Sequence, residues 1–128
     1  MNDSIYESGE DYLETILRLE KRLGQVRSID IANEMTYSKP SISRAMKILG
    51  EKGMLYMDEH KYIHLTEEGL AKAKKIYHRH LLIREILIDL LGVAPEQAEE
   101  DACRVEHIVS DETITKLEKK LEELKEKH

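Results

Sequence analysis

A cysteine, a glutamate and a histidine lie close together late in the chain, as Cys103, Glu106 and His107. The surrounding pattern predicts a helix, and residues three and four apart share one helix face, so these side chains would point the same way. Glu99, four residues before Cys103, falls on that face too. Thiolate, carboxylate and imidazole donors together suit borderline first-row ions rather than Mg²⁺ or Ca²⁺. The segment therefore predicts a transition-metal site.

One helix face cannot supply every ligand, and Asp11, Glu14 and His80 are the further donors that we expect. Each residue also has an ordinary structural explanation. Acidic residues near a helix start interact favourably with the helix dipole, and a histidine on an apolar face is commonly a core residue. Cys103, taken singly, resembles a small buried hydrophobic residue. Their joint occurrence favours a metal site, and ligands on the first helix would link it to the segment that follows that helix.

The composition is that of a helical protein without a membrane segment. The 128 residues carry a net charge of −6, include one cysteine, and contain neither tryptophan nor phenylalanine. No apolar run approaches the roughly 18 residues of a membrane helix, and the acidic N-terminus does not have the pattern of a secretory signal. One cysteine cannot form an internal disulfide, which fits a reducing cytosol. We expect a cytoplasmic protein with an aliphatic core.

The excess of acidic residues lies entirely in the C-terminal part. Residues 1–80 contain 13 basic and 13 acidic residues, whereas residues 81–128 contain 7 and 13. Within residues 39–52, four basic residues stand against Glu51 alone. Because the local distribution of charge matters more than its sum, this segment can favour phosphate.

The first half of the chain has the pattern of a winged helix-turn-helix. Apolar residues at helical spacing predict three helices, with Ser28 and Ser38 as N-caps of the second and third. Two short alternating runs then predict a β-hairpin. The expected elements are helices over about 5–23, 28–35 and 38–53, and strands over 55–57 and 63–65.

The second half is predicted to be helical throughout. Thr66 opens a long helix that reaches about Leu91, Pro95 starts another, and Ser110 or Asp111 caps the last. We therefore expect a mainly α fold with two domains. Residues 1–75 would form a winged helix-turn-helix DNA-binding domain, and residues 76–128 a helical metal-binding and dimerisation domain. A surplus of apolar residues on the long helix predicts the dimer interface, namely Leu81, Leu82, Ile86, Leu90 and Leu91.

A recognition helix in the major groove needs polar and basic side chains near its N-terminal end, opposite its apolar face. The third helix meets this need, and Arg44 has the planar fork that suits guanine edges. Two residues at the tip of the hairpin could contact the DNA backbone or the minor groove. A winged helix that only mediates protein contacts is the alternative. The candidate DNA-contacting residues are Ser38, Lys39, Pro40, Ser41, Ser43, Arg44, Lys47, His60 and Lys61.

Residues 101–110, Asp-Ala-Cys-Arg-Val-Glu-His-Ile-Val-Ser, closely resemble the metal-binding helix of the diphtheria-toxin repressor family. The opening at residues 10–14, Glu-Asp-Tyr-Leu-Glu, resembles that of the family's manganese transport regulators. The similarity continues through the helix start at residues 38–41, the Leu65-Thr66 junction and His80. This resemblance implies a homodimeric, metal-activated transcription factor, usually a repressor of metal-uptake genes.

The resemblance also implies a ligand set. The matching positions are Asp11, Glu14, His80, Cys103, Glu106 and His107. Cys103 is typical of iron-responsive members, whereas Asp11 and Glu14 are of the manganese type, so the chain mixes two patterns. Arg84 stands where iron-type members have a carboxylate, and Glu99 matches an ancillary histidine position and is a weaker candidate. We expect no third, SH3-like domain.

The resulting hypothesis is a repressor that binds double-stranded operator DNA as a homodimer when it holds Fe²⁺ or Mn²⁺. Zn²⁺, Co²⁺ or Ni²⁺ could substitute in vitro. The alternative is a winged-helix regulator that responds to a small molecule or to thiol redox, with a purely structural metal site. A metallo-hydrolase is not expected because the chain has no His-Glu-x-x-His arrangement. The sequence leaves open the physiological metal, the number of ions, the operator and whether Glu99 is a ligand.

Overall fold

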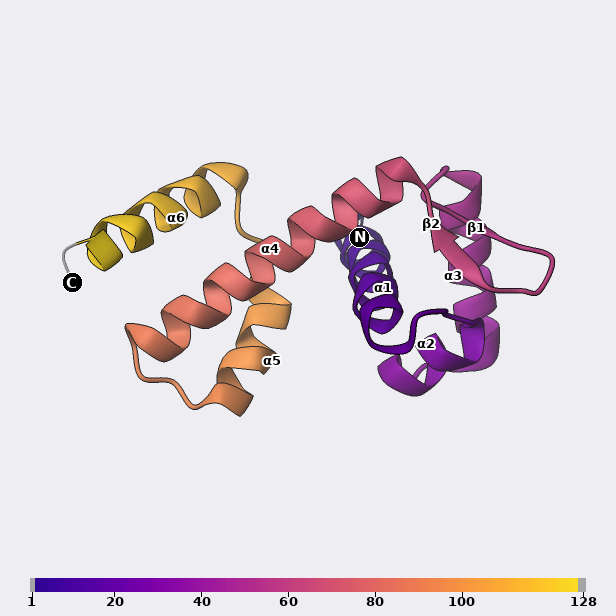
Figure 1. Cartoon of the computed structure of the whole chain (residues 1–128), viewed down its shortest axis with the longest axis horizontal. Helices are drawn as coiled ribbons and strands as arrows, with labels where there is room; N and C mark the ends of the chain where they lie inside the picture. Colours follow the sequence, from indigo (N-terminus) through magenta and orange to yellow (C-terminus); the bar gives the residue numbers. More distant parts are fainter. Residues whose placement is uncertain (1, 127–128) are drawn as a thin grey trace. The chain divides into compact units, whose positions relative to one another are not determined.

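The computed structural model describes residues 2–126, with side chains from residue 9 onward. The elements in order are α1 (Asn2–Leu23), α2 (Ser28–Met35), α3 (Lys39–Glu51), β1 (Leu55–Met57), β2 (Ile63–Leu65), α4 (Glu67–Asp89), α5 (Pro95–Val105) and α6 (Asp111–Glu126) (Figure 1). The mainly α fold with one antiparallel hairpin is confirmed. The chain divides into two compact units, Met1–Lys75 and Ile76–His128, and the boundary falls inside α4.

In the first unit, α1, α2 and α3 pack together and against the hairpin (Figure 1). The hairpin pairs Leu55 with Leu65 and Met57 with Ile63. The Ile63 amide also donates to the Val26 carbonyl at 2.7 Å, which ties the segment between α1 and α2 to β2. The fully buried apolar residues of this unit include Ile16, Ile31, Ile42 and Ile63. This aliphatic core holds α3 with its opposite face exposed.

Of the two N-caps predicted for α2 and α3, one is correct and the other is wrong. Ser38 is the N-cap of α3 as predicted, and its Oγ accepts a hydrogen bond from the Ser41 amide at 3.4 Å. The prediction that Ser28 caps α2 is wrong, because Arg27 is the N-cap and Ser28 is already helical. The Arg27 amide donates to Asp30 Oδ2 at 2.9 Å, so an acidic side chain in the first turn takes the role expected of the serine.

The hairpin is fixed to the start of α4 by a close backbone contact. The Thr66 amide donates to the Met54 carbonyl at 3.0 Å, and Thr66 Oγ1 accepts from the Gly69 amide at 3.1 Å. A Cβ atom at Gly69 would lie 1.9 Å from the Met54 carbonyl oxygen. Only glycine fits at this position, so the wing and α4 meet without a side chain between them.

The second unit has its own apolar core, which α4, α5 and α6 share. Its buried residues are Leu82, Ile83, Ala102, Ile114 and Leu121. Ser110 Oγ accepts from the Thr113 amide at 3.1 Å and so caps α6, in agreement with one of the two predicted caps. Pro95 opens α5 as predicted. Two ion pairs of α4 with α6, His78 with Glu118 and Glu85 with Lys125, lie at the surface.

The surplus of apolar residues on α4 is smaller than expected. Leu82 is buried in the core of the second unit, so its place in the predicted dimer interface is wrong, whereas Ile86 packs against that core and stays partly exposed. Leu81 remains 45% exposed; Leu90 and Leu91, just beyond α4, are 49% and 68% exposed. These three leucines are therefore the most exposed residues of the predicted interface. Within residues 2–126, no helix is long and apolar enough to cross a membrane.

Candidate metal centre and DNA-binding surface

His80, completely buried on α4, is the central residue of a cluster of ionisable side chains in the second unit. Its Nδ1 lies 2.9 Å from Glu106 Oε2, and its Nε2 lies 2.9 and 2.8 Å from the two carboxylate oxygens of Glu99. Cys103 Sγ is 3.9 Å from the same Nδ1. Both ring nitrogens of this histidine therefore face negative or ionisable groups.

The charge of His80 follows from these neighbours. Burial disfavours the imidazolium, but hydrogen bonds with Cys103, Glu106 and Glu99 outweigh it and raise the pKa of His80 to about 11. A protonated ring would donate to both carboxylates. Binding of a metal ion to a His80 nitrogen requires that this nitrogen lose its proton, because only a deprotonated ring nitrogen has a free lone pair.

The donors of His80, Glu99 and Cys103 lie within 4.8 Å of one another. This set offers nitrogen, oxygen and sulfur, the combination that suits borderline first-row ions. Glu99 was the weaker candidate in the sequence, yet it has the most extensive contact with His80. In the sequence, Glu99 was indicated by its position four residues before Cys103, on the same face of the helix.

The predicted single helix bearing Cys103, Glu106 and His107 is wrong in detail. Helix α5 ends at Val105, Glu106 is its C-cap, and His107 lies in the turn that follows. Glu106 keeps helical backbone angles, and its amide still donates to the Ala102 carbonyl at 3.0 Å. His107 Nε2 lies 3.3 Å from Glu106 Oε1. The break in the helix therefore puts His107 beside Glu106 and leaves Cys103 with Glu99.

The completely buried carboxylate of Glu106 fits a metal ligand. Its Oε2 contacts His80, whereas Oε1 accepts no hydrogen bond from the described part of the chain and has His107 Nε2 at 3.3 Å. A buried carboxylate oxygen in this state is costly unless a cation compensates it. His107 beside it supplies a nitrogen donor. The residues present thus fit a divalent ion on two grounds, the mixed donor set and this open buried oxygen.

The sequence analysis missed Arg79, which is buried beside His80. Its Nη2 donates to the Val109 carbonyl and lies 3.9 Å from Asp111 Oδ1. These contacts hold the turn that begins with His107 and leads into α6. The sequence places Arg79 directly before the candidate ligand His80. This position did not indicate burial, because basic residues on helices are usually exposed.

Asp11 and Glu14 lie on α1 of the first unit, three residues apart and therefore on one face of the helix. Glu14 is buried with 4% exposure, and Asp11 is partly buried. Within the first unit they form a pair of neighbouring carboxylates. Their part in a ligand set that includes residues of the second unit remains a prediction.

The candidate DNA-contacting residues of α3 form an exposed face opposite its core. Ile42, Met46 and Leu49 are buried, whereas every candidate on this helix is exposed, namely Lys39, Pro40, Ser41, Ser43, Arg44 and Lys47, with the cap Ser38. Ser38 Oγ and Ser41 Oγ hydrogen-bond each other at 2.9 Å, so these hydroxyls are partly satisfied within the helix start. The basic side chains are the stronger candidates for phosphate and base contact.

The wing is organised by Asp58, whose role the sequence analysis missed. Its Oδ1 accepts hydrogen bonds from the His60 and Tyr62 amides at 2.9 and 3.0 Å, and its Oδ2 lies 2.7 Å from His64 Nε2. Lys61 has a φ of 68°, which this turn requires. The exposed tip, His60 and Lys61, is thus presented by a folded turn.

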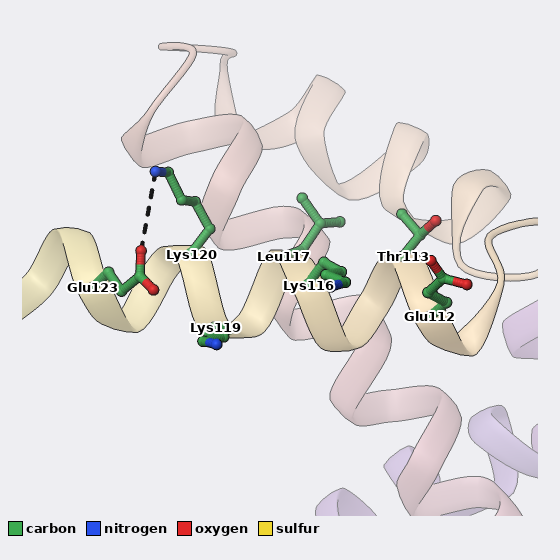
Figure 2. Close-up of a pocket in the computed structure, with 7 residues that line it drawn as sticks. All are labelled: Glu112, Thr113, Lys116, Leu117, Lys119, Lys120 and Glu123. Carbon is green, nitrogen blue, oxygen red and sulfur yellow. Dashed lines mark ion pairs between the residues drawn. The ribbon is translucent and has the colours of Figure 1, made fainter.

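A surface hollow of about 500 Å³ lies along α6 and is lined by Glu112, Thr113, Lys116, Leu117, Lys119, Lys120 and Glu123 (Figure 2). All of its residues belong to one helix, and two of them, Lys120 and Glu123, form an ion pair one turn apart at 4.0 Å. None of the candidate ligands lines it. It offers no convergent set of polar groups for a small molecule.

Comparisons with known proteins match the chain to two family models that meet at residues 65 and 66. Residues 4–65 match the family model described as the N-terminal DNA binding domain of iron dependent repressors. Residues 66–128 match the model described as their metal binding and dimerisation domain.

Individual proteins are also similar to this chain over most of its length. The transcriptional regulator MntR of Escherichia coli O157:H7 is 35% identical over 105 residues, which cover 82% of this chain and 67% of that protein. An uncharacterized HTH-type transcriptional regulator of Methanocaldococcus jannaschii is 32% identical and covers 94% of this chain and 98% of its own length. The solved structure of the manganese regulator SloR is 32% identical with a TM-score of 0.80. It covers 89% of this chain, whereas the match spans 53% of the SloR chain, about half its length.

Proposed function

This chain belongs to the iron dependent repressor family, and from this premise we propose that it is a metal-activated repressor that binds operator DNA as a homodimer. The family resemblance expected from the sequence is confirmed. The metal is Fe²⁺ or Mn²⁺ in this proposal, since the matched family models describe iron dependent repressors and SloR is a manganese regulator. The chain acts in the cytoplasm and has no enzymatic role.

The observation that carries the proposal is the partly buried cluster around His80. Nitrogen, oxygen and sulfur donors converge there, and Glu106 keeps an open buried oxygen. A divalent ion would supply positive charge and hold these donors in a fixed arrangement. His80, Glu99, Cys103, Glu106 and His107 would contribute from the second unit.

We further propose that Asp11 and Glu14 of α1 complete the ligand set. Their spacing presents two carboxylates on one helix face, and the family resemblance assigns both positions to the metal. Ligands from both units would couple metal binding to the arrangement of the DNA-binding domains. Metal can favour the DNA-competent arrangement only by binding it more tightly than other arrangements.

Operator affinity in metal and in chelator tests the proposal. A duplex selected from a random pool in the presence of Mn²⁺ would serve as the operator, and Fe²⁺ would be tested without oxygen. Wild-type protein should bind at least about tenfold more tightly with metal, within the usual range of coupling between two sites. Asp11→Asn should reduce this ratio, and His107→Ala should abolish it because it removes a ligand nitrogen.

Glu20→Gln is the matched control, because it removes a carboxylate from an exposed position of α1. Its metal response should equal that of the wild type. Equal wild-type affinity in metal and chelator would reject the metal switch. If affinity then changed on oxidation of Cys103, the thiol-redox alternative would replace it.

A further inference from the structure

The Glu99 carboxylate contacts two side chains of α4, the imidazole of His80 and the guanidinium of Arg84. Its Oε2 is 2.8 Å from His80 Nε2 and 3.2 Å from Arg84 Nε. His80 and Arg84 are four residues apart, so they share one face of the helix. The same oxygen that would bind a metal ion beside His80 is thus already held by a permanent positive charge.

The cluster is graded from buried to exposed. Glu106 and His80 are completely buried, whereas the side chains of Glu99 and Arg84 are 36% and 40% exposed. Arg84 and Glu99 are therefore about equally accessible to solvent, whereas His80 is not. A guanidinium does not lose its proton in proteins, so this charge stays at every accessible pH.

We propose that Arg84 is a built-in cation that weakens divalent-ion binding at the His80–Glu99–Cys103 donors by competing for Glu99. This inference rests on the proposed function, because it assumes that these donors bind metal. An ion that uses Glu99 must break the contact with Arg84 or share the carboxylate with it, and it is repelled by the nearby positive charge. Arg84 thereby sets the affinity, and so the occupancy, of this part of the centre.

Three variants of the full chain isolate the charge. Arg84→Gln removes it, Arg84→Lys retains it, and Arg104→Gln removes an equal charge from an exposed position of α5. Ion number and affinity would be measured by equilibrium dialysis with Mn²⁺ and Co²⁺. The thiolate-to-Co²⁺ absorption band would report binding at Cys103. If Arg84 had a merely structural role, its replacement would not change this band.

Arg84→Gln should bind the Cys103-linked ion about tenfold more tightly, since one charge close to a divalent ion contributes roughly that factor under solvent-like screening. Arg84→Lys and Arg104→Gln should resemble the wild type. In a Glu99→Gln background, Arg84→Gln should have a much smaller effect, because the competition acts through Glu99. An Arg84→Gln protein with the ion number, affinity and Co²⁺ spectrum of Arg104→Gln would overturn the inference alone. A wild type that binds neither ion would overturn the proposed function as well.

Discussion

His80 on α4 and Glu106 at the end of α5 form a completely buried pair, with Nδ1 2.9 Å from Oε2. The pair joins two elements of the second unit at the point where α5 stops and His107 begins the turn. Removing one member of a buried ion pair leaves the other charge uncompensated. This contact is therefore structural as well as part of the candidate metal centre.

His80→Ala should lower the free energy of unfolding of the metal-free protein by about 3–5 kcal/mol, the usual loss when a buried pair is broken. His78→Ala is the control on the same helix. His78 is 60% exposed and pairs with Glu118 at the surface, so its loss should be below about 1 kcal/mol. Urea unfolding in chelator measures both. Equal losses in the two variants would show that the buried His80–Glu106 pair stabilises the protein no more than the surface pair does.

Gly69→Ala should destabilise the protein by about 1–3 kcal/mol, as overpacking does, because its Cβ would collide with the Met54 carbonyl oxygen. Gly50→Ala is the matched change, since a Cβ there meets Leu55 at an ordinary 3.8 Å. In the α3 helix it should be neutral or stabilise by up to about 1 kcal/mol. Thermal unfolding of Gly69→Ala and Gly50→Ala would compare the stabilities of the two variants. A tolerated Gly69→Ala would contradict the close packing of the wing against α4.

The wing should lose stability in acid through Asp58. The hydrogen bond from His64, together with those from the Tyr62 and His60 amides, lowers the pKa of Asp58 below its usual value. Its contribution is therefore complete above the unfolded pKa, near 4, and is lost as the pH falls through the lower folded pKa. Asp58→Asn should flatten this acid limb relative to wild type.

Glu59→Gln is the control for that measurement, because the Glu59 side chain is 86% exposed at the same turn. Its dependence of unfolding free energy on pH should follow the wild type. The same acid limb in Asp58→Asn and wild type would show that Asp58 does not anchor the wing.

Arg44→Ala should reduce affinity for the selected operator by about 1–3 kcal/mol and relax preference at one base pair. Lys47→Ala should weaken binding to every sequence and flatten the salt dependence, since a phosphate contact carries no sequence information. Lys72→Ala removes an exposed charge from α4 and controls for net charge. Fluorescence anisotropy at several salt concentrations would separate the three. If Arg44→Ala bound the operator as tightly as the wild type, Arg44 would not contact the operator.

Leu91→Glu should shift the protein towards monomer, because Leu91 is 68% exposed and a buried carboxylate would oppose a symmetric apolar interface. Sedimentation equilibrium of the full chain measures the shift. Ile48→Glu, at an exposed apolar position of the first unit, serves as the comparison. Unchanged dimerisation in Leu91→Glu would exclude this end of the long helix from the interface.

The sequence by itself determined the order of elements and most of their ends. Strands 55–57 and 63–65 have the predicted bounds, although burial does not alternate along them, since only Leu55 and Ile63 are buried. Ser38 and Pro95 set helix starts through local hydrogen bonding and a fixed φ, which neighbouring residues alone decide. The donor types of the metal centre were equally visible, because only a few side chains bind transition metals.

Only the tertiary structure decided how those donors group. Cys103, Glu106 and His107 lie within a few residues of one another, yet Cys103 lies with Glu99 and His80, and His107 beside Glu106. That division depends on where α5 stops and on which α4 residue faces it. The Glu99–Arg84 contact is likewise set by packing between α4 and α5, and the burial of Arg79 by its contacts with Val109 and Asp111. Helical spacing places residues on a face, but the partner of that face is fixed by long-range burial, which a local pattern does not encode.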